Sequence, residues 1–420
     1  MREVRLENRA GRSLGARLAG MSRELKLFVV ASFAMGMAFS VVDAMLNNFI
    51  NDRFTISGWQ RAFLEFPREL PGVLVIFVSA LLWFLCSRRL GAVAMLFGVV
   101  GALLIGFGAS TYGLMVIFLF IYSLGFHIFS PLSASIGMEL AREGQTGQRL
   151  GQLNAVRNVA TIAGSFLVYV GFKFLAFTYE HAFVVAAVGL AVAAAFMFSM
   201  RPDRTQKPAM YLKPRREYRL YYLLAVLFGS RKQLFMTFAP WVLVTVFHQP
   251  TQTLATLLTV GGVIGILFLP LLGWAIDRLG ERLVLAAEAV LLVFVCLGYG
   301  FGRSFFSEGV AFWVACVCFL LDQMLFSVNM ARSTYMKKIA LHPADVQPAL
   351  TLSVSLDHIF SIAVALLGGW IWSTFGFQYV FLLGVFIALA NLWAALQVRV
   401  PEGRAVPEAS VVAAVPEEQA

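Results

Sequence analysis

The stretch GWAIDRLGER, residues 273–282, lies where two long apolar runs meet, residues 253–276 and 281–302. Each run has about 20 residues, the length at which a helix rising 1.5 Å per residue crosses about 30 Å of hydrocarbon. Because lipid offers the backbone no hydrogen-bond partners, runs of this length are expected to be helical. The quoted stretch is therefore interpreted as a short polar turn between two membrane-spanning helices.

The same criterion, applied outward from this turn, finds apolar runs along nearly the whole chain. Of the 420 residues, 60% are hydrophobic and only 13% are charged, whereas about a quarter are charged in a typical soluble domain. The composition predicts an all-α integral membrane protein with twelve transmembrane helices. The predicted spans are residues 24–49, 67–87, 91–109, 112–138, 152–173, 181–200, 219–247, 253–276, 281–302, 307–335, 348–373 and 377–398.

The net charge of +10 is unevenly distributed between alternate loops. Most Lys and Arg fall in the tail 1–21, in the loop 201–218 and in the other segments on the same side of the predicted membrane. This asymmetry predicts a multi-pass protein of the cytoplasmic (inner) membrane with both termini in the cytoplasm. The basic excess indicates topology and attraction to anionic membrane lipids, and no nucleic-acid partner is expected. The tail 401–420 contains Pro and Glu without periodicity and is predicted to be disordered.

The predicted spans divide into two sets of six around the basic linker 201–218. The two sets share sequence echoes: SRRLGAV (87–93) with IDRLGER (276–282), and AVRNVATIAG (155–164) with SLDHIFSIAV (355–364). Internal duplication is typical of transporters built from two repeats. We therefore expect two pseudo-symmetric six-helix bundles, residues 22–200 and 219–400.

The stretch GWAIDRLGER, residues 273–282, resembles the loop signature of the major facilitator superfamily of secondary transporters, approximately G-x-x-x-D-R-x-G-R-[RK]. Five positions match and Glu281 departs; the matching residues are Gly273, Asp277, Arg278, Gly280 and Arg282. In the first copy Phe84 stands at the Gly position and Arg88 at the Asp position, while Arg89 and Gly91 remain. The resemblance implies the two-bundle fold and a gating lock between Asp277 and Arg278 or Arg282. It does not define the substrate.

Polar residues recur inside the apolar runs at helical spacing. A charge deep in hydrocarbon costs about 3 kcal/mol, so such side chains are expected to face a cavity or a partner. For His127 alone, an ordinary interhelical hydrogen bond is the favoured interpretation. The predicted substrate or proton path comprises Asp43, Asn47, His127, Arg157, Asn158, Arg231, Lys232, Asp322, Gln323, Asn329, Asp357 and His358.

Two positions leave alternatives open. If the span 219–247 is one continuous helix, Arg231 and Lys232 are cavity cations suited to an anionic substrate; otherwise they lie at the membrane edge after an interfacial helix. Asp357 aligns with Arg157 across the duplication, so either a proton or Arg157 neutralises it. The charges of FLEFPRELPG, residues 63–72, are interpreted as a solvated ring at the outer entrance in preference to the alternative, a substrate site.

The leading hypothesis is a secondary active transporter of a small solute, coupled to protons through Asp357 and His358. The alternatives are a transporter-like receptor or scaffold and a membrane-embedded lipid-modifying enzyme. The sequence has neither a nucleotide-binding G-x-x-x-x-G-K-[ST] motif nor an H-E-x-x-H motif. We expect no enzyme activity, no cofactor, no metal and a monomer; substrate identity and direction of transport are left open.

Overall fold

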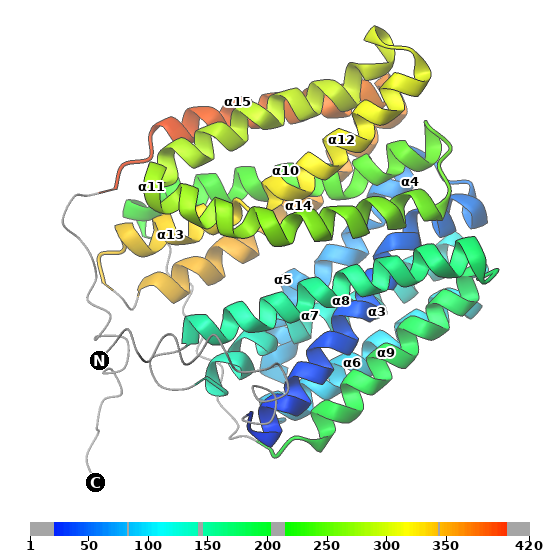
Figure 1. The fold of residues 1–420 in the computed structure, drawn as a ribbon, viewed down its shortest axis with the longest axis vertical. Helices are drawn as coiled ribbons and strands as arrows, with labels where there is room; N and C mark the ends of the chain where they lie inside the picture. Colours follow the sequence, from blue (N-terminus) through cyan, green and yellow to red (C-terminus); the bar gives the residue numbers. More distant parts are fainter. Residues whose placement is uncertain (1–20, 82–83, 142–145, 203–214, 343–344, 401–420) are drawn as a thin grey trace.

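The computed structural model describes residues 21–81, 84–141, 146–202, 215–342 and 345–400, and within them the regular structure is entirely helical (Figure 1). The predicted tails and most of the predicted linker lie outside these ranges. In chain order the elements are α3 (Arg23–Phe54), α4 (Gly58–Phe63), α5 (Glu65–Leu81), α6 (Ser87–Leu103), the π-helix η1 (Leu104–Gly108), α7 (Tyr112–Glu139), α8 (Thr146–Phe174), α9 (Tyr179–Ser199), the 3₁₀-helix η2 (Arg216–Tyr218), α10 (Arg219–Thr245), α11 (Thr251–Phe305), α12 (Glu308–Phe326), α13 (Asn329–Ile339), α14 (Val346–Phe375) and α15 (Phe377–Leu396).

Nine helical segments in the described ranges are long and apolar enough to cross a membrane. They are Arg23–Phe54, Ser87–Gly108, Tyr112–Glu139, Arg149–Phe174, Tyr179–Ser199, Thr251–Phe305, Glu308–Ile339, Leu352–Phe375 and Phe377–Leu396. The predicted spans 67–87 and 219–247 fall on helices outside this set: α5 has 17 residues, and α10 carries Arg231 and Lys232 at mid-length. The nine segments establish a multi-pass membrane protein.

The helix α11 is 55 residues long and doubles back on itself (Figure 1). Its helical geometry is interrupted at Gly280, which has φ 80° and ψ 161°. This backbone region is accessible almost only to glycine, because a Cβ would clash with the neighbouring peptide groups. The glycine of the quoted motif therefore allows the chain to reverse between the runs 253–276 and 281–302.

The helices pack mainly with others from the same part of the chain. The helix α3 packs against α8 and α9, and α6 against α7 and α9, whereas α11 contacts α12 and α15, and α10 contacts α14 and α15. One buried hydrophobic cluster is drawn almost wholly from residues 28–200, and the other two almost wholly from residues 218–398. We refer below to residues 22–200 as the first segment and to residues 219–400 as the second segment.

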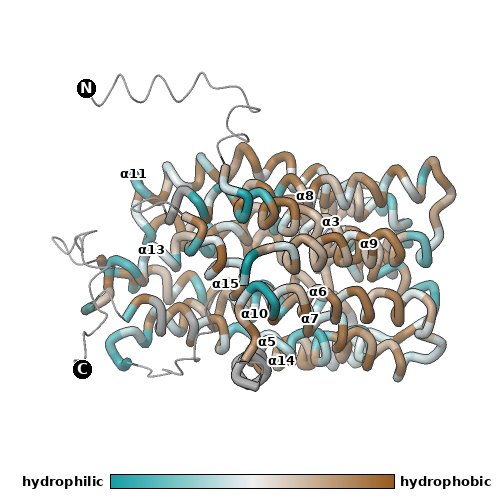
Figure 2. The backbone as a smooth tube through the Cα atoms, turned by 90° about the horizontal axis from the view of Figure 1, so that it is seen from below, coloured by the Kyte–Doolittle hydropathy of each residue, from teal (hydrophilic) through white to brown (hydrophobic). Residues whose placement is uncertain are grey.

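The outer surface of the helices is strongly apolar. Large side chains such as Leu267, Phe294 and Trp313 are 77%, 66% and 68% exposed. Figure 2 shows hydrophobic residues along most of the helix lengths, with hydrophilic residues concentrated toward helix ends. This surface would be unfavourable in water and suits contact with lipid chains.

The two segments meet closely where α4 crosses α14. A Cβ on Gly369 would lie 2.3 Å from the Cβ of Ala62, and one on Gly58 would lie 2.3 Å from Trp372. The backbone N–H of Trp59 also donates to Ser373 Oγ at 3.0 Å. We call this contact the Trp59 seam, and the absence of side chains on its glycines lets the two helices approach.

The opposite end of the first segment is held by charges. Arg88 Nη1 donates to the carbonyl of Arg201 at 2.5 Å and lies 3.5 Å from Glu24, and Arg88 Nη2 lies 2.5 Å from Glu139. Arg88 occupies the position of the Asp in the family signature, so the sign of the charge is reversed at this position. These contacts tie α3, α6 and α7 of the first segment to Arg201, which follows α9 by two residues.

Candidate functional site

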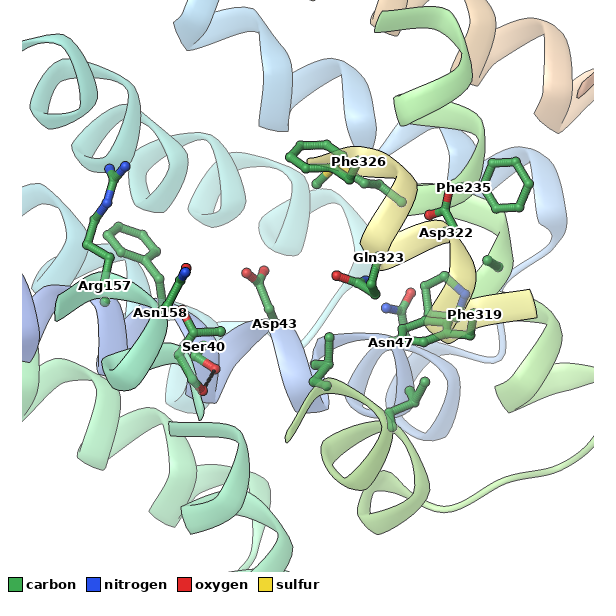
Figure 3. Close-up of a pocket in the computed structure, with 18 of the residues that line it drawn as sticks. Ser40, Asp43, Asn47, Arg157, Asn158, Phe235, Phe319, Asp322, Gln323 and Phe326 are labelled. Carbon is green, nitrogen blue, oxygen red and sulfur yellow. Dashed lines mark hydrogen bonds between the residues drawn. The ribbon is translucent and has the colours of Figure 1, made fainter. Parts of the chain in front are cut away.

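A cavity of about 460 Å³ lies between the first and second segments (Figure 3). Helices α3, α5, α7 and α8 line one side, and α10, α11 and α12 line the other. Asp43 and Gln323 project into it from opposite sides. The lining residues are Met35, Gly36, Phe39, Ser40, Asp43, Asn47, Arg68, Phe126, Arg157, Asn158, Thr161, Phe235, Met236, Ala239, Pro240, Leu254, Leu258, Phe319, Asp322, Gln323 and Phe326.

The structure brings half of the predicted path residues together at this cavity. Those that line it are Asp43, Asn47, Arg157, Asn158, Asp322 and Gln323. Those that lie outside its lining are His127, Arg231, Lys232, Asn329, Asp357 and His358. Of the second group, Asn329 is exposed at the start of α13, whereas the others are buried or half-buried inside the helix packing.

Two arginines line the cavity, Arg68 and Arg157, and they have different kinds of partner. Arg68 Nη2 lies 3.2 Å from Asp43 Oδ1, and Arg68 Nη1 lies 3.7 Å from Glu65. Arg157 Nη2 instead donates to Asn154 Oδ1 at 2.6 Å, and it forms no ion pair with a carboxylate of the described residues. Arg157 is therefore the lining cation without a carboxylate partner among the described residues.

The charged residues of FLEFPRELPG are not a solvated ring, so that prediction is wrong. Glu65 and Glu69 are only 1% and 6% exposed. Arg61 Nη1 lies 2.7 Å from Glu65, and Gln233 Nε2 donates to the other Glu65 oxygen at 2.8 Å. Arg68, which lies among these charges and lines the cavity, is not one of the predicted path residues. The sequence does contain a sign of this burial, because acidic and basic residues recur here at i+3 and i+4 spacing. Side chains at this spacing on a helix can neutralise each other in the interior.

The helix α10 runs without interruption through Arg231 and Lys232, and both side chains are buried. The break before these residues that the membrane-edge alternative assumes is therefore not present in α10. Arg231 Nη2 lies 3.1 Å from Asp322 Oδ1, and Arg231 Nε lies 3.9 Å from Glu288, which also pairs with Arg332 at 2.7 Å. Since a buried cation is tolerated only with a partner, Arg231 is held by acidic side chains of its own segment.

Asp357 is paired with Lys232, whereas Arg157, one of the two alternatives for its neutralisation, donates to Asn154. Lys232 Nζ donates to Asp357 Oδ2 at 2.6 Å, and Ser361 Oγ donates to Asp357 Oδ1 at 3.2 Å. The neighbouring His358 points to the first segment, where its Nδ1 lies 2.7 Å from Glu69 Oε2. The adjacent residues Asp357 and His358 thus have different partners, one within the second segment and one across the interface.

Among the described residues, His127 has no partner for the predicted interhelical hydrogen bond. Its Nδ1 lies 3.0 Å from the carbonyl oxygen of Ser123, one turn earlier on α7. Its ring does cross the interface, with its centroid 5.1 Å from that of His358.

The gating pair expected within the quoted motif is not formed in this conformation. Asp277, Arg278 and Arg282 are all exposed, and Asp277 makes no ion pair with another described residue. Glu281, the position that departs from the signature, is instead buried and lies 2.6 Å from Lys338 Nζ on α13. The charge contact at this turn is therefore made by the departing residue.

Comparison with known proteins agrees with this helical architecture. The family model described as Major Facilitator Superfamily matches residues 70–340, and the chain belongs to this superfamily. No curated protein sequence matches the chain.

Solved structures of transporters share its fold. The nucleoside transporter NupG superposes with a TM-score of 0.69 at 13% identity, covering 89% of this chain and 98% of that one. A D-xylose–proton symporter gives 0.65 at 16% identity, covering 90% and 97%. The inward-open xylose transporter XylE from E. coli gives 0.67 at 14% identity, again covering 90% and 97%.

Proposed function

We propose that this chain is a secondary active transporter that moves a small solute by alternating access. The observation that carries the proposal is the cavity of about 460 Å³, which is lined by charged and amide side chains from both segments. A solute bound there would contact both segments. A movement of one segment relative to the other would therefore change the side of the membrane from which the solute is accessible.

The transporter has twelve spans in two six-helix bundles. Nine described segments qualify as spans by length and composition. Counting α11 as two spans on either side of Gly280, and adding α5 and α10, raises nine to twelve. The bundles are residues 22–200 and 219–400. The linker between them, residues 201–218, is rich in Lys and Arg, which favours a cytoplasmic location for the linker.

The conformation described here is closed at the Trp59 seam. Two further hydrogen bonds join the segments: Asn48 Nδ2 to the Gln249 carbonyl at 2.8 Å, and Gln252 Nε2 to the Phe172 carbonyl at 3.2 Å. These residues lie in the helix ends and loops that the charge distribution assigns to the outer side. Closure on this side is what the inward-facing member of the cycle requires, in the orientation that we propose.

Proton coupling is supported by two contacts between a carboxylate and a basic side chain. They are Asp357 with Lys232 and Glu69 with His358, and Asp357 and His358 are adjacent on α14. Protonation of Glu69 would remove the charge that holds His358 across the interface, and protonation of Asp357 would release Lys232 within the second segment. A cation that loses its carboxylate partner in the interior must find another or become solvated. Proton arrival is thereby linked to the contacts between the segments.

The solute that we propose is a small polar molecule with an anionic or strongly accepting group. Arg157 is the lining cation without a carboxylate partner among the described residues, and Asn158 and Gln323 supply amide groups. Phe39, Phe126 and other apolar residues complete the lining. The volume falls in the range of small-molecule sites.

The test begins with a thermal-shift screen of purified protein against nucleosides, pentoses and small carboxylates. Compounds that stabilise the protein are radiolabelled, and their uptake into proteoliposomes is measured with and without a pH gradient. We expect accumulation that requires the gradient and collapses with a protonophore. Binding without uptake in either condition would identify a receptor and contradict the proposal.

A further inference from the structure

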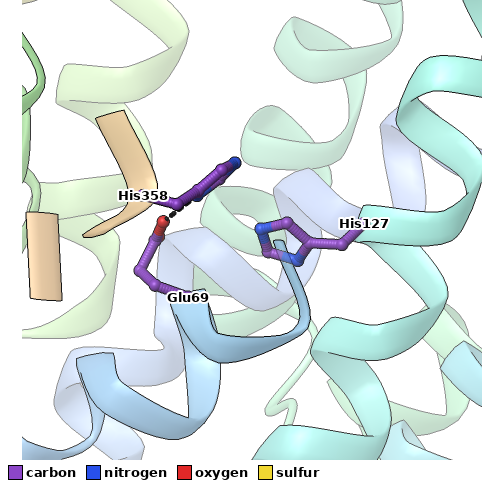
Figure 4. A group of neighbouring side chains, drawn as sticks. All are labelled: Glu69, His127 and His358. Carbon is purple, nitrogen blue, oxygen red and sulfur yellow. Dashed lines mark hydrogen bonds and ion pairs between the residues drawn. The ribbon is translucent and has the colours of Figure 1, made fainter. Parts of the chain in front are cut away.

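Three side chains with metal-binding atoms converge at the interface of the two segments (Figure 4). They are Glu69 on α5, His127 on α7 and His358 on α14, and one ligand atom from each lies within 4.8 Å of the other two. Glu69 and His127 are buried, and the side chain of His358 is 14% exposed. None of the three lines the solute cavity.

The bonding of the two imidazoles suits them to coordinate a metal ion. With Nδ1–H of His127 donating to the Ser123 carbonyl at 3.0 Å, its Nε2 presents a lone pair. This arrangement, in which one ring nitrogen donates and the other binds metal, is the usual one in proteins. His358 Nδ1 lies 2.7 Å from Glu69 Oε2, a contact that an ion could replace by binding both atoms.

The packing leaves room for both rings. The imidazole centroids are 5.1 Å apart with planes inclined by 67°. Gly72 follows Glu69 by one turn of α5, and a Cβ there would lie 2.7 Å from His127 Cδ2 and 2.8 Å from His358 Nδ1. Only a residue without a side chain allows this approach. A tetrahedral ion with bonds of about 2.0–2.1 Å holds its ligand atoms about 3.4 Å apart. Ligand atoms that are now up to 4.8 Å apart would approach by as much as about 1.4 Å, and His358 Nδ1 and Glu69 Oε2, now 2.7 Å apart, would separate by about 0.7 Å.

The local charge also favours a cation. Lys232 and Asp357, which neighbour the cluster, neutralise each other at 2.6 Å. Glu69 is then the carboxylate of the cluster, beside the imidazoles of His127 and His358. Two imidazoles and one carboxylate are the donors that zinc and similar divalent transition metals accept, with a further position left for water.

We propose that Glu69, His127 and His358 form a binding site for a divalent transition-metal ion of the zinc type, assembled only when the two segments meet as they do here. Glu69 and His127 belong to the first segment and His358 to the second. A ligand that binds one conformation shifts the equilibrium toward it. The ion would therefore hold α14 against α5 and α7 and favour the conformation described here.

The primary test titrates Co²⁺ into full-length, EDTA-treated protein in detergent and follows its visible absorption, with Zn²⁺ added afterwards in competition. We expect one ion per chain, and at least about a tenfold loss of affinity in His358→Gln and in Glu69→Gln. The matched control is His342→Gln, an exposed histidine outside the cluster, which should bind as the wild type does. No saturable binding, or an equal loss in His342→Gln, would overturn the proposal.

A second variant retains all three ligands. Gly72→Ala places a methyl group against both rings and should also weaken Co²⁺ binding by about tenfold. Zn²⁺ should raise the melting temperature of the wild type and not that of His358→Gln, because only binding to the folded form stabilises it. Wild-type affinity in Gly72→Ala would contradict the proposed geometry. Neither measurement involves transport, so a protein that transports without binding metal overturns this inference alone.

Discussion

Two sets of buried charges in this protein differ in what they connect. The first set, Arg231, Glu288, Asp322 and Arg332, lies within α10–α13 of the second segment. In the second set, Glu69 with His358 and Glu65 with Gln233, each contact joins α5 to the second segment. We call them the inner network and the crossing contacts.

In the proposed cycle, this difference would allow the protein to contain many buried charges and still move. In the proposed cycle the inner network travels with its segment and stays intact, so disrupting it should cost stability. The crossing contacts must part in each cycle, so disrupting them, or the pairs beside them, should change transport or conformation more than folding. The following variants separate these two effects.

The largest expected effect is on the inner network. The Glu288 side chain is fully buried, 2.7 Å from Arg332 and 3.9 Å from Arg231. Glu288→Gln leaves Arg332 as a buried charge without its acidic partner and should lower the free energy of unfolding by about 3–5 kcal/mol. Thermal unfolding in detergent measures this. The control Glu308→Gln removes a carboxylate that is 71% exposed and should change the free energy of unfolding by less than about 1 kcal/mol. An equal loss of stability in both variants would contradict the distinction between the inner network and other charges.

Asp357→Asn tests the pair that lies beside the crossing contacts. It removes the charge that holds Lys232 at 2.6 Å, so gradient-driven uptake should fall by at least about tenfold, or about 1.4 kcal/mol in the barrier. The melting temperature should fall less than in Glu288→Gln, because both side chains retain some exposure. Asp345→Asn, which breaks an ion pair with Arg215 outside the predicted spans, is the control. Wild-type uptake and pH dependence in Asp357→Asn would exclude the coupling role.

Arg157→Gln tests a lining charge that belongs to neither set. Its hydrogen bond to Asn154 lies within α8, so folding should be unaffected. If its charge meets the solute, affinity should fall by about tenfold, as expected for loss of one charge-assisted hydrogen bond. Binding of the solute identified in the screen provides the measurement. Lys173→Gln, at the far end of the same helix, should leave affinity unchanged, and a matching loss there would show that the effect is not local.

The smallest expected effect is at the Trp59 seam. Ser373→Ala removes one hydrogen bond between the segments, worth about 1 kcal/mol, and should shift the conformational balance by about fivefold. The rate at which an impermeant thiol reagent, added from the outer side, modifies Gln323→Cys reports opening of the cavity. We expect a faster rate in Ser373→Ala. No change is expected in Ser199→Ala, whose hydroxyl bonds within its own helix.

Much of the architecture is predictable because it depends on local properties of the chain. Runs of apolar residues indicate the helices, and the quoted motif indicates the superfamily, including the need for glycine at position 280. Polar residues at helical spacing in α3, α8 and α12 identify cavity positions such as Asp43, Asn158 and Gln323. Each of these inferences uses only neighbours within a few turns.

The pairings of the charges are not predictable in this way, because they depend on how distant helices pack. Lys232 and Asp357 are 125 positions apart, and the contact follows from the packing of α10 against α14. Glu65 and Glu69 stand near a predicted helix end, where charges are normally solvated, yet α14 and α10 cover them. An internal alignment places Arg157 opposite Asp357, but equivalent positions in two repeats need not be in contact.

The Trp59 seam has a thermal consequence. Its core consists of Gly58, Ala62, Gly369 and Trp372, which contact one another without charges. Closing such a surface removes apolar area from water and so carries a negative heat-capacity change. The attraction it provides weakens on cooling, whereas ion pairs do not follow this dependence. The equilibrium between the closed and open forms of the seam should therefore show a curved temperature dependence, and the population of the closed form should fall at low temperature.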